Sequence, residues 1–264
     1  MKKFAIVTGA SSGIGKEYAR QLAAAGYGVV VVSERDADNN SVAEQIAAQY
    51  GVEALPLCVD LTADDAAERV FAFAKELDGE VDILVNNAGM LLFSTLERTP
   101  AERIDKIIAL HCTTPTKLCR LFAADMSRRG RGHIVLMSSV TAWTPYPTIS
   151  HYGATKAYLK SFGQSLWYEM RDKGVSVTTV YPSAVDTPFY NLDDKMRRRL
   201  LFCGLMLSAE DVARRVLRAM ARGRRECLPG FWTKLEAAIC AVLPAWALLP
   251  ILKIPAVRRI LERI

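Results

Sequence analysis

Short apolar runs alternate with helix-like stretches along most of this chain, and this alternation limits the possible fold more than any other feature. The strand-like runs cover residues 4–8, 28–33, 54–59, 82–86, 132–138, 175–181 and 226–228. The helix-like stretches cover residues 14–25, 41–50, 64–77, 101–129, 151–173 and 209–222. Most of the runs are apolar throughout, as in strands that are covered on both faces. The sequence therefore predicts an α/β fold with a doubly wound parallel sheet and helices on both faces.

Length and composition agree with one globular domain followed by a hydrophobic extension. The chain has 264 residues, of which 51% are hydrophobic and 23% are charged, and this balance excludes disordered and low-complexity proteins. No repeat or Gly/Ser linker interrupts residues 1–230, so we expect one domain there and an extension over residues 231–264. The net charge of +6 is not gathered into one basic tract, which argues against nucleic acid as a partner.

The cysteines and the N-terminus bear on the cellular compartment. The six cysteines form no CxxC motif, so we expect reduced thiols and no metal site. The apolar run that follows Lys2 and Lys3 is too short for the core of a signal peptide. These features predict a cytoplasmic protein.

A glycine-rich turn follows the first predicted strand. The chain reads TGASSGIG over residues 8–15, and a helix-like stretch follows at once. Glycines at such a turn let the backbone approach a pyrophosphate, and the helix N-terminus offers unpaired N–H groups with partial positive charge. A tight strand-to-helix turn requires glycines for its own sake as well. The position directly after the first strand favours nucleotide binding.

The spacing TGxxxGxG resembles that of the short-chain dehydrogenase/reductase family in its single-domain form. Other parts of the sequence match at the family's spacings: Asp60 after the third strand, NNAG over residues 86–89, and a Ser…Tyr-x-x-x-Lys set. PSAVDT over residues 182–187 resembles the loop that reaches the nicotinamide. The resemblance covers residues 1–228 and implies a Rossmann-like, NAD(P)-binding catalytic domain.

The resemblance also implies a role for each matching residue. Catalysis falls to Ser139, Tyr152 and Lys156. The residues implied for cofactor binding are Gly9, Ser11, Ser12, Gly13, Ile14, Gly15, Ser33, Arg35, Asp60, Leu61, Asn87, Ala88, Gly89, Tyr152, Lys156, Pro182, Val185 and Thr187.

The catalytic set can also be interpreted from its chemistry alone. Tyr152 and Lys156 are four residues apart in a helix-like stretch, so they share one face. An ammonium group beside a phenol lowers the phenol's pKa and prepares it to exchange a proton with a carbonyl oxygen. Ser139 follows the fifth predicted strand, where it can hold the same oxygen by a hydrogen bond.

Two residues depart from the family's pattern. His111 stands where members of the family usually carry an asparagine that kinks its helix and anchors a water next to the lysine. An imidazole could relay protons there itself, which makes His111 a candidate catalytic residue, or it could only fill space. Ser183 replaces the common glycine after Pro182 and could tighten that loop.

The choice of cofactor depends on the residues just after the second strand. NAD-preferring relatives place an acid first after the strand, and this chain has Ser33 there. Arg35 and Lys16 could bind the ribose phosphate of NADP, whereas Glu34 would repel it. We therefore expect NADP, with NAD as the alternative.

The C-terminal extension contains an uncharged stretch over residues 237–252, broken by Pro244 and Pro250. It is short and kinked for a membrane span. The flanking Lys234 and Lys253 suit contact with anionic headgroups. The alternatives left open are packing on its own domain or on a second subunit of a homodimer or homotetramer, a hydrophobic gate at the substrate entrance that also gives peripheral contact with the inner face of a membrane, or a true transmembrane span.

Together these features predict hydride transfer between a nicotinamide cofactor and a small-molecule carbonyl or secondary alcohol. Apolar residues predict a hydrophobic substrate of lipid, 3-oxoacyl or steroid-like type. These residues are Trp143, Tyr146, Phe189, Leu201 and Phe202. The alternative is a cofactor-binding redox sensor or scaffold with little or no turnover, which the missing asparagine keeps open. A membrane adaptor built on the extension would leave the catalytic set without a purpose.

Overall fold

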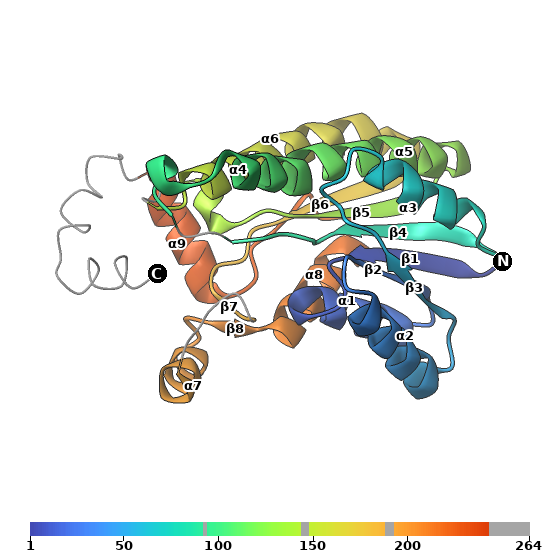
Figure 1. Cartoon of the computed structure of the whole chain (residues 1–264), viewed down its shortest axis with the longest axis horizontal. Helices are drawn as coiled ribbons and strands as arrows, with labels where there is room; N and C mark the ends of the chain where they lie inside the picture. Colours follow the sequence, from blue (N-terminus) through green and yellow to red (C-terminus); the bar gives the residue numbers. More distant parts are fainter. Residues whose placement is uncertain (92–93, 144–147, 188–192, 243–264) are drawn as a thin grey trace.

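The computed structural model describes residues 1–91, 94–143, 148–187 and 193–242, and its centre is a sheet of seven parallel strands. The strands follow the order β3-β2-β1-β4-β5-β6-β9 (Figure 1). Their bounds are β1 Lys3–Thr8, β2 Gly28–Ser33, β3 Ala54–Cys58, β4 Glu80–Asn86, β5 Gly132–Met137, β6 Val175–Val180 and β9 Glu226–Cys227. The predicted doubly wound parallel sheet is confirmed.

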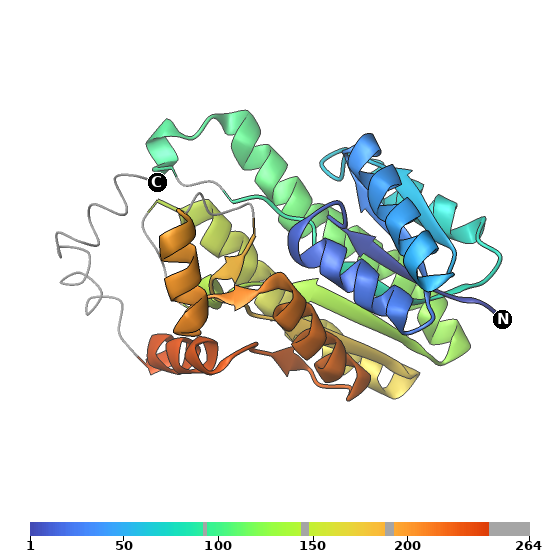
Figure 2. The ribbon, with the colours of Figure 1, turned by 90° about the horizontal axis from the view of Figure 1, so that it is seen from below.

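Helices cover both faces of the sheet (Figures 1 and 2). One face carries α1 (Gly13–Ala24), α2 (Asp36–Tyr50) and α8 (Ala209–Ala221). The other carries α3 (Ala66–Lys75), α5 (Thr114–Arg129) and α6 (Ser150–Met170). Successive side chains of a strand point to opposite faces of the sheet. In β1, Phe4 and Ile6 pack toward α3 and α5, whereas Ala5 and Val7 pack toward α1 and α8.

The helix predicted over residues 101–129 contains a break in its hydrogen-bonding pattern. It consists of α4 (Ala101–Ile108), the π-helical segment η2 (Ala109–Thr113) and α5. A π segment holds one extra residue in its turn and is frequent at functional sites. His111 lies in its middle and is buried.

Three helical regions differ from the sequence-based expectation. α2 begins at Asp36 rather than at residue 41, because Asp36 and Asp38 in its first turn complement the helix dipole. α7 (Asp194–Phe202) and α9 (Phe231–Val242) lie beyond the carboxyl edge of the sheet, at the left of Figure 1. The segment predicted over 237–252 falls partly in α9, and the rest lies outside the described residues. No helix in the described ranges is long and apolar enough to cross a membrane.

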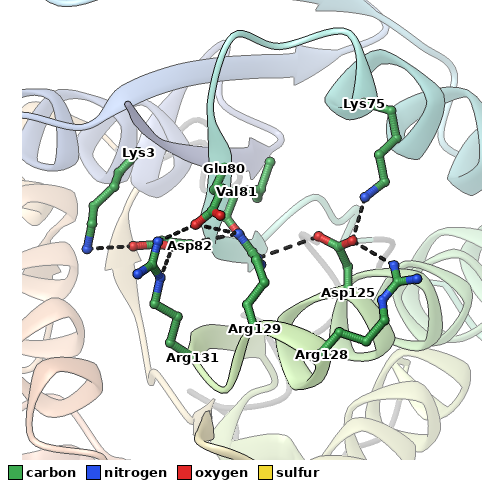
Figure 3. A network of polar contacts seen from close by, with 9 residues as sticks. All are labelled: Lys3, Lys75, Glu80, Val81, Asp82, Asp125, Arg128, Arg129 and Arg131. Atoms are coloured by element: carbon green, nitrogen blue, oxygen red, sulfur yellow. Dashed lines mark hydrogen bonds and ion pairs between the residues drawn. The ribbon is translucent and has the colours of Figure 1, made fainter. Parts of the chain in front are cut away.

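A network of charged residues occupies the opposite, amino edge of the sheet (Figure 3). Asp82 of β4 is 4% exposed, and its carboxylate lies 2.8 Å from Lys3 Nζ and 3.4 Å from Arg131 Nε. Arg129 Nη1 lies 3.9 Å from the same carboxylate and 3.3 Å from Glu80, which also pairs with Arg131. The buried negative charge is therefore surrounded by three cations.

The network continues along α5 through Asp125 (Figure 3). Its carboxylate pairs with Lys75 at 2.5 Å, Arg128 at 2.9 Å and Arg129 at 3.6 Å. Burial by itself would raise the pKa of Asp125, but the neighbouring cations, Lys75 first, outweigh burial and lower it. Arg129 also donates to Val81 O at 2.7 Å, which ties α5 to β4.

Candidate active site

A cavity of about 580 Å³ opens at the carboxyl edge of the sheet, where the loops after β1, β2, β3, β4, β5 and β6 converge. It is lined by every residue predicted to be catalytic and by every residue predicted to bind the cofactor except Gly15. Open α/β sheets bind ligands at this edge, next to the strand where the chain reverses direction across the sheet. The predicted residues are thus assembled in one site, while their individual roles remain predictions.

The turn after β1 is packed tightly against the loop after β4. Gly9 has φ +67°, and a Cβ on it would lie 2.9 Å from Ala88 Cα. A Cβ on Gly15 would lie 2.1 Å from Gly9 O. Gly15 therefore packs against the backbone of the turn and does not line the cavity. Thr8 Oγ1 accepts hydrogen bonds from the N–H groups of Asn87 at 2.9 Å and Ala88 at 3.0 Å. Thr8 is therefore a positioning residue that the sequence prediction omitted from the site.

The N-terminus of α1 is open toward this cavity. Ser12 occupies the cap position without a side-chain hydrogen bond to the helix, and no acid lies in the first turn. Gly13 has φ +54°, and a Cβ on it would approach Thr187 Cγ2 to 3.3 Å. The unpaired N–H groups and the partial positive charge suit a phosphate group. A close backbone turn at a helix N-terminus therefore fits the pyrophosphate of a dinucleotide.

The loops after β2 and β3 form the far end of the cavity. Ser33 Oγ donates to Asn39 Oδ1 at 2.6 Å and accepts from Arg35 N at 3.1 Å, so its hydroxyl group stabilises the loop. The guanidinium of Arg35 is well exposed and lies 3.6 Å from Asp38. Asp60 accepts from Thr62 N at 2.8 Å and from Thr62 Oγ1 at 2.7 Å, and these bonds lower the pKa of its carboxyl.

Tyr152, Lys156 and Ser139 meet at the other end. Lys156 is 5% exposed, and its Nζ donates to Met137 O at 2.9 Å and lies 5.4 Å from the centre of the Tyr152 ring. Burial lowers the pKa of Lys156 to about 8, so the group stays mostly charged at neutral pH. Ser139 lies at the end of β5, where its Oγ accepts from Thr141 N at 3.2 Å. A cation beside a phenol favours the phenolate form.

His111 connects two parts of this site. Its Nε2 accepts from Met90 N at 3.0 Å, and its Nδ1 lies 2.9 Å from Thr155 Oγ1, which in turn donates to Tyr152 O at 2.8 Å. This network assigns the proton to Nδ1 and makes the ring neutral. Burial first, and then Lys156, hold the pKa of His111 well below its usual value. The ring thus fastens the loop after β4 to the helix that carries Tyr152, and a proton relay remains a prediction.

The loop after β6 is fixed by backbone and side-chain bonds. Pro182 O accepts from Val140 N at 3.1 Å, and Ser183 Oγ donates to Glu236 Oε2 at 2.6 Å. Glu236 belongs to α9 and lines the cavity. Glu236 was not predicted as a site residue, because it precedes the uncharged stretch over 237–252 and belongs to no motif.

The apolar wall of the cavity differs from the predicted one. Phe202 is 93% exposed, and neither it nor Leu201 lines the cavity, because α7 lies beyond the carboxyl edge of the sheet. Trp143 does not line the cavity either, since its ring packs against the ring of Tyr181 with 4.4 Å between the centroids. Tyr146 and Phe189 lie outside the described residues. The apolar lining includes Met90, Leu91, Leu110, Val140 and Ile149. Among the described residues no cluster of His, Cys, Asp or Glu could hold a metal ion.

Comparison with known proteins agrees with this architecture. A family model described as short chain dehydrogenase matches residues 3–197. A very-long-chain 3-oxoacyl-CoA reductase of Pyricularia oryzae is 35% identical over 182 residues, which are 67% of this chain and 54% of that protein. The corresponding reductase of Bos taurus is 34% identical over 70% of this chain and 60% of its own length. The chain therefore spans less than two thirds of the length of these two relatives.

Other relatives match over nearly their whole length. An uncharacterized oxidoreductase of Staphylococcus epidermidis is 31% identical over 84% of this chain and 92% of its own length. A short-chain dehydrogenase from Sphingobium yanoikuyae in complex with NADPH superimposes with a TM-score of 0.79 at 28% identity, covering 90% of this chain and 93% of that one. A bulky-bulky ketone specific alcohol dehydrogenase from Comamonas testosteroni gives 0.77 at 28% identity, covering 90% and 92%. The resemblance inferred from the sequence is confirmed, and the chain belongs to the short-chain dehydrogenase family.

Proposed function

We propose that this protein is an NADP-dependent oxidoreductase that interconverts a carbonyl compound and a secondary alcohol. The observation that carries the proposal is the buried Lys156 next to Tyr152, with Ser139 in the same cavity wall. Burying a lysine next to a phenol costs stability, and such arrangements concentrate at catalytic sites. Lys156 would also serve a cofactor-binding protein without turnover, so its combination with Tyr152 and Ser139 in one cavity is what favours an enzyme.

The residues of the chain supply the proton chemistry. When bound, the nicotinamide supplies or accepts the hydride at the carbonyl carbon. Ser139 donates a hydrogen bond to the carbonyl oxygen, and Tyr152 transfers its phenolic proton to that oxygen as the alcohol forms. The Lys156 ammonium stabilises the phenolate that remains. In the reverse direction Tyr152 accepts the alcohol proton.

The remaining polar lining fits the dinucleotide. We assign the pyrophosphate to the turn over residues 9–15 and the N-terminus of α1, and the adenosine to the loops that carry Asp60 and Leu61. Asn87, Ala88 and Gly89 and the loop Pro182–Thr187 then enclose the ribose and nicotinamide. The exposed Arg35 supports NADP over NAD, since its guanidinium can bind a 2′-phosphate. The Sphingobium yanoikuyae dehydrogenase, in complex with NADPH, supports the same assignment.

The apolar lining supports a hydrophobic substrate, for which the 3-oxoacyl-CoA reductases and the bulky-ketone alcohol dehydrogenase offer two models. The test is NADPH oxidation by the full chain with a panel of long-chain 3-oxoacyl thioesters, bulky ketones and small ketones. We expect turnover with at least one hydrophobic class and little with small ketones. Cofactor binding without turnover on the whole panel would favour the sensor or scaffold alternative, which His111 in place of the usual asparagine motivates.

We also propose that the domain over residues 1–230 works in the cytoplasm and that the extension over 231–264 gives peripheral membrane contact. Large apolar side chains project outward from α7 and α9: Phe202, Phe231, Trp232, Ile239 and Val242. The two helices are joined, since Trp232 Nε1 donates to Cys203 O at 3.0 Å. Exposed cations surround them: Lys195, Arg198, Arg199 and Lys234. This combination suits anionic lipid.

Sedimentation with vesicles tests the membrane proposal. The full chain should bind phosphatidylserine-containing vesicles at low salt and leave neutral vesicles unbound, and Phe231→Ser with Val242→Ser should reduce binding. Light scattering on the same samples gives the oligomeric state, which we propose to be a homodimer or homotetramer. If the double variant leaves vesicle binding unchanged but dissociates the oligomer, the apolar face belongs to a subunit interface.

A further inference from the structure

Helix α9 turns polar side chains toward the domain and large apolar side chains toward solvent. Thr233 and Ala237 are buried and Glu236 is half-buried, whereas Phe231 and Val242 are 72% and 80% exposed. A surface helix normally turns its apolar side chains inward. Here a carboxylate points toward the domain, which suggests that it is placed there for a ligand.

The position of Glu236 is fixed by the loop after β6. Ser183 Oγ donates to Glu236 Oε2 at 2.6 Å, and the preceding Pro182 accepts from Val140 N at 3.1 Å, one residue after Ser139. A hydrogen bond to a carboxylate is stronger than one between neutral groups. The serine that departs from the family's usual glycine therefore holds this carboxylate in the wall of the cavity that also contains Ser139.

Glu236 lies apart from the other acidic residues that line this cavity. Of the three acids in the described lining, Glu34 and Asp60 belong to the loops after β2 and β3. Glu236 belongs to α9 and shares the lining with the hydroxyl groups of Thr141 and Ser183 and the apolar Val140 and Ile149. A carboxylate can accept several hydrogen bonds at once, so the bond from Ser183 is compatible with a further donor from a substrate.

We propose that Glu236 is a substrate-recognition residue, which accepts a hydrogen bond from a neutral hydroxyl group on an otherwise apolar ketone or alcohol. The same charge disfavours substrates that carry a carboxylate at that position, because two like charges held close together repel each other and lose hydration. The inference rests on the proposed oxidoreductase function and narrows its substrate class. Sites built to bind a hydroxyl group discriminate strongly against analogues that lack it.

A matched substrate series tests this role. The series contains acetophenone, 4′-(hydroxymethyl)acetophenone and 4-acetylbenzoate, together with the longer 2-decanone, 10-hydroxy-2-decanone and 9-oxodecanoate. In the parent protein we expect kcat/KM to be about tenfold higher for the hydroxyl compound than for the plain ketone in at least one series, and lowest for the carboxylate. Glu236→Gln should raise kcat/KM for the carboxylate about tenfold, and Glu236→Ala should abolish the preference for the hydroxyl compound. Ser183→Ala should weaken that preference without reversing it.

Controls separate this inference from the proposed function. Glu169→Gln removes one negative charge from an exposed position on α6 and should leave the ranking unchanged. Dissociation constants of the six compounds, measured by calorimetry on the protein loaded with oxidised NADP, which has no hydride to give to a ketone, should show the same ranking without turnover. If the parent binds the compounds but oxidises no NADPH, the proposed function fails while the binding data still test Glu236. If both Glu236 variants keep the parent's ranking in binding and in turnover, Glu236 does not recognise the substrate.

Discussion

The two edges of the central sheet bury charge in opposite ways. At the carboxyl edge, Lys156 is 5% exposed, and the partner of its ammonium in the described structure is the carbonyl of Met137. At the amino edge, Asp82 is 4% exposed and is surrounded by Lys3, Arg129 and Arg131 (Figure 3). A buried charge without an opposite charge costs stability and shifts its pKa, whereas a compensated one mainly stabilises the fold. The comparison predicts that changes at the first edge alter activity and changes at the second alter stability.

The largest effect should follow Tyr152→Phe at the carboxyl edge. Removing a placed proton donor typically costs about 10²–10⁴-fold in rate, so kcat should fall by at least about 100-fold. The melting temperature and the dissociation constant of NADPH should stay near the parent's values. A variant with near-normal turnover would exclude Tyr152 as the acid–base residue.

At the amino edge we expect a substitution to change the free energy of unfolding and to leave turnover unchanged. Asp82→Asn removes the charge shared by three cations and should lower the free energy of unfolding by about 3 kcal/mol, measured by urea denaturation. Turnover per folded molecule should not change. Asp172→Asn is the control, because its pair with Arg171 is exposed and should contribute less than about 0.5 kcal/mol. Equal losses from both substitutions would contradict the special role of the buried network.

Lys156→Met should separate activity from stability at one residue. The pKa of Lys156 is lowered from 10.5 to about 8, so below pH 8 the folded state bears the full cost of the buried charge. Between pH 8 and 10.5 the unfolded state binds more protons, and this cost disappears as the pH rises. Lys156→Met should therefore raise the free energy of unfolding by about 2 kcal/mol at pH 7, with a gain that shrinks above pH 8, while turnover falls. A destabilised variant at pH 7 would show that the ammonium has stabilising partners.

His111 allows a smaller test of the carboxyl edge. His111→Ala removes the bonds to Met90 and Thr155 and should lower kcat about tenfold, while His111→Asn should retain much of the activity. If the ring relays protons, the pH profile of kcat should shift in His111→Ala. An unshifted pH profile with a uniformly lower rate would show that the ring only positions its neighbours. Unchanged kinetics would show that the side chain only fills space.

The smallest effect concerns Arg35, whose guanidinium is exposed. Arg35→Ala should weaken NADPH binding several-fold and NADH binding less, because only NADPH has a 2′-phosphate to lose. Dissociation constants measured by fluorescence at two salt concentrations would check this. Equal losses for both cofactors would exclude Arg35 as the phosphate-binding residue.

The carboxyl edge could be predicted from the sequence to a much greater extent than the amino edge. The glycine turn, Ser139, Tyr152 and Lys156 occur at fixed spacings, and parallel strands bring such residues to one edge. Lys3 and Asp82 resemble ordinary surface charges in the sequence, and only the pairing of β1 with β4 places them together. Thr155 and Glu236 were missed for the same reason, since their partners lie 44 and 53 residues away.

The π-helical segment η2 has a consequence for how the chain length can change. An α-helix turns by about 100° per residue, so the extra residue in η2 sets the rotation of α4 relative to α5. Ile107 is fully buried and His111 contacts both Met90 and Thr155 only in this rotation. Substitutions within residues 109–113 change only the contacts of the exchanged side chain, but deletion of a single residue there would rotate Ile107 out of the core and His111 out of the site. This stretch should therefore tolerate exchange of residues far better than any change in their number.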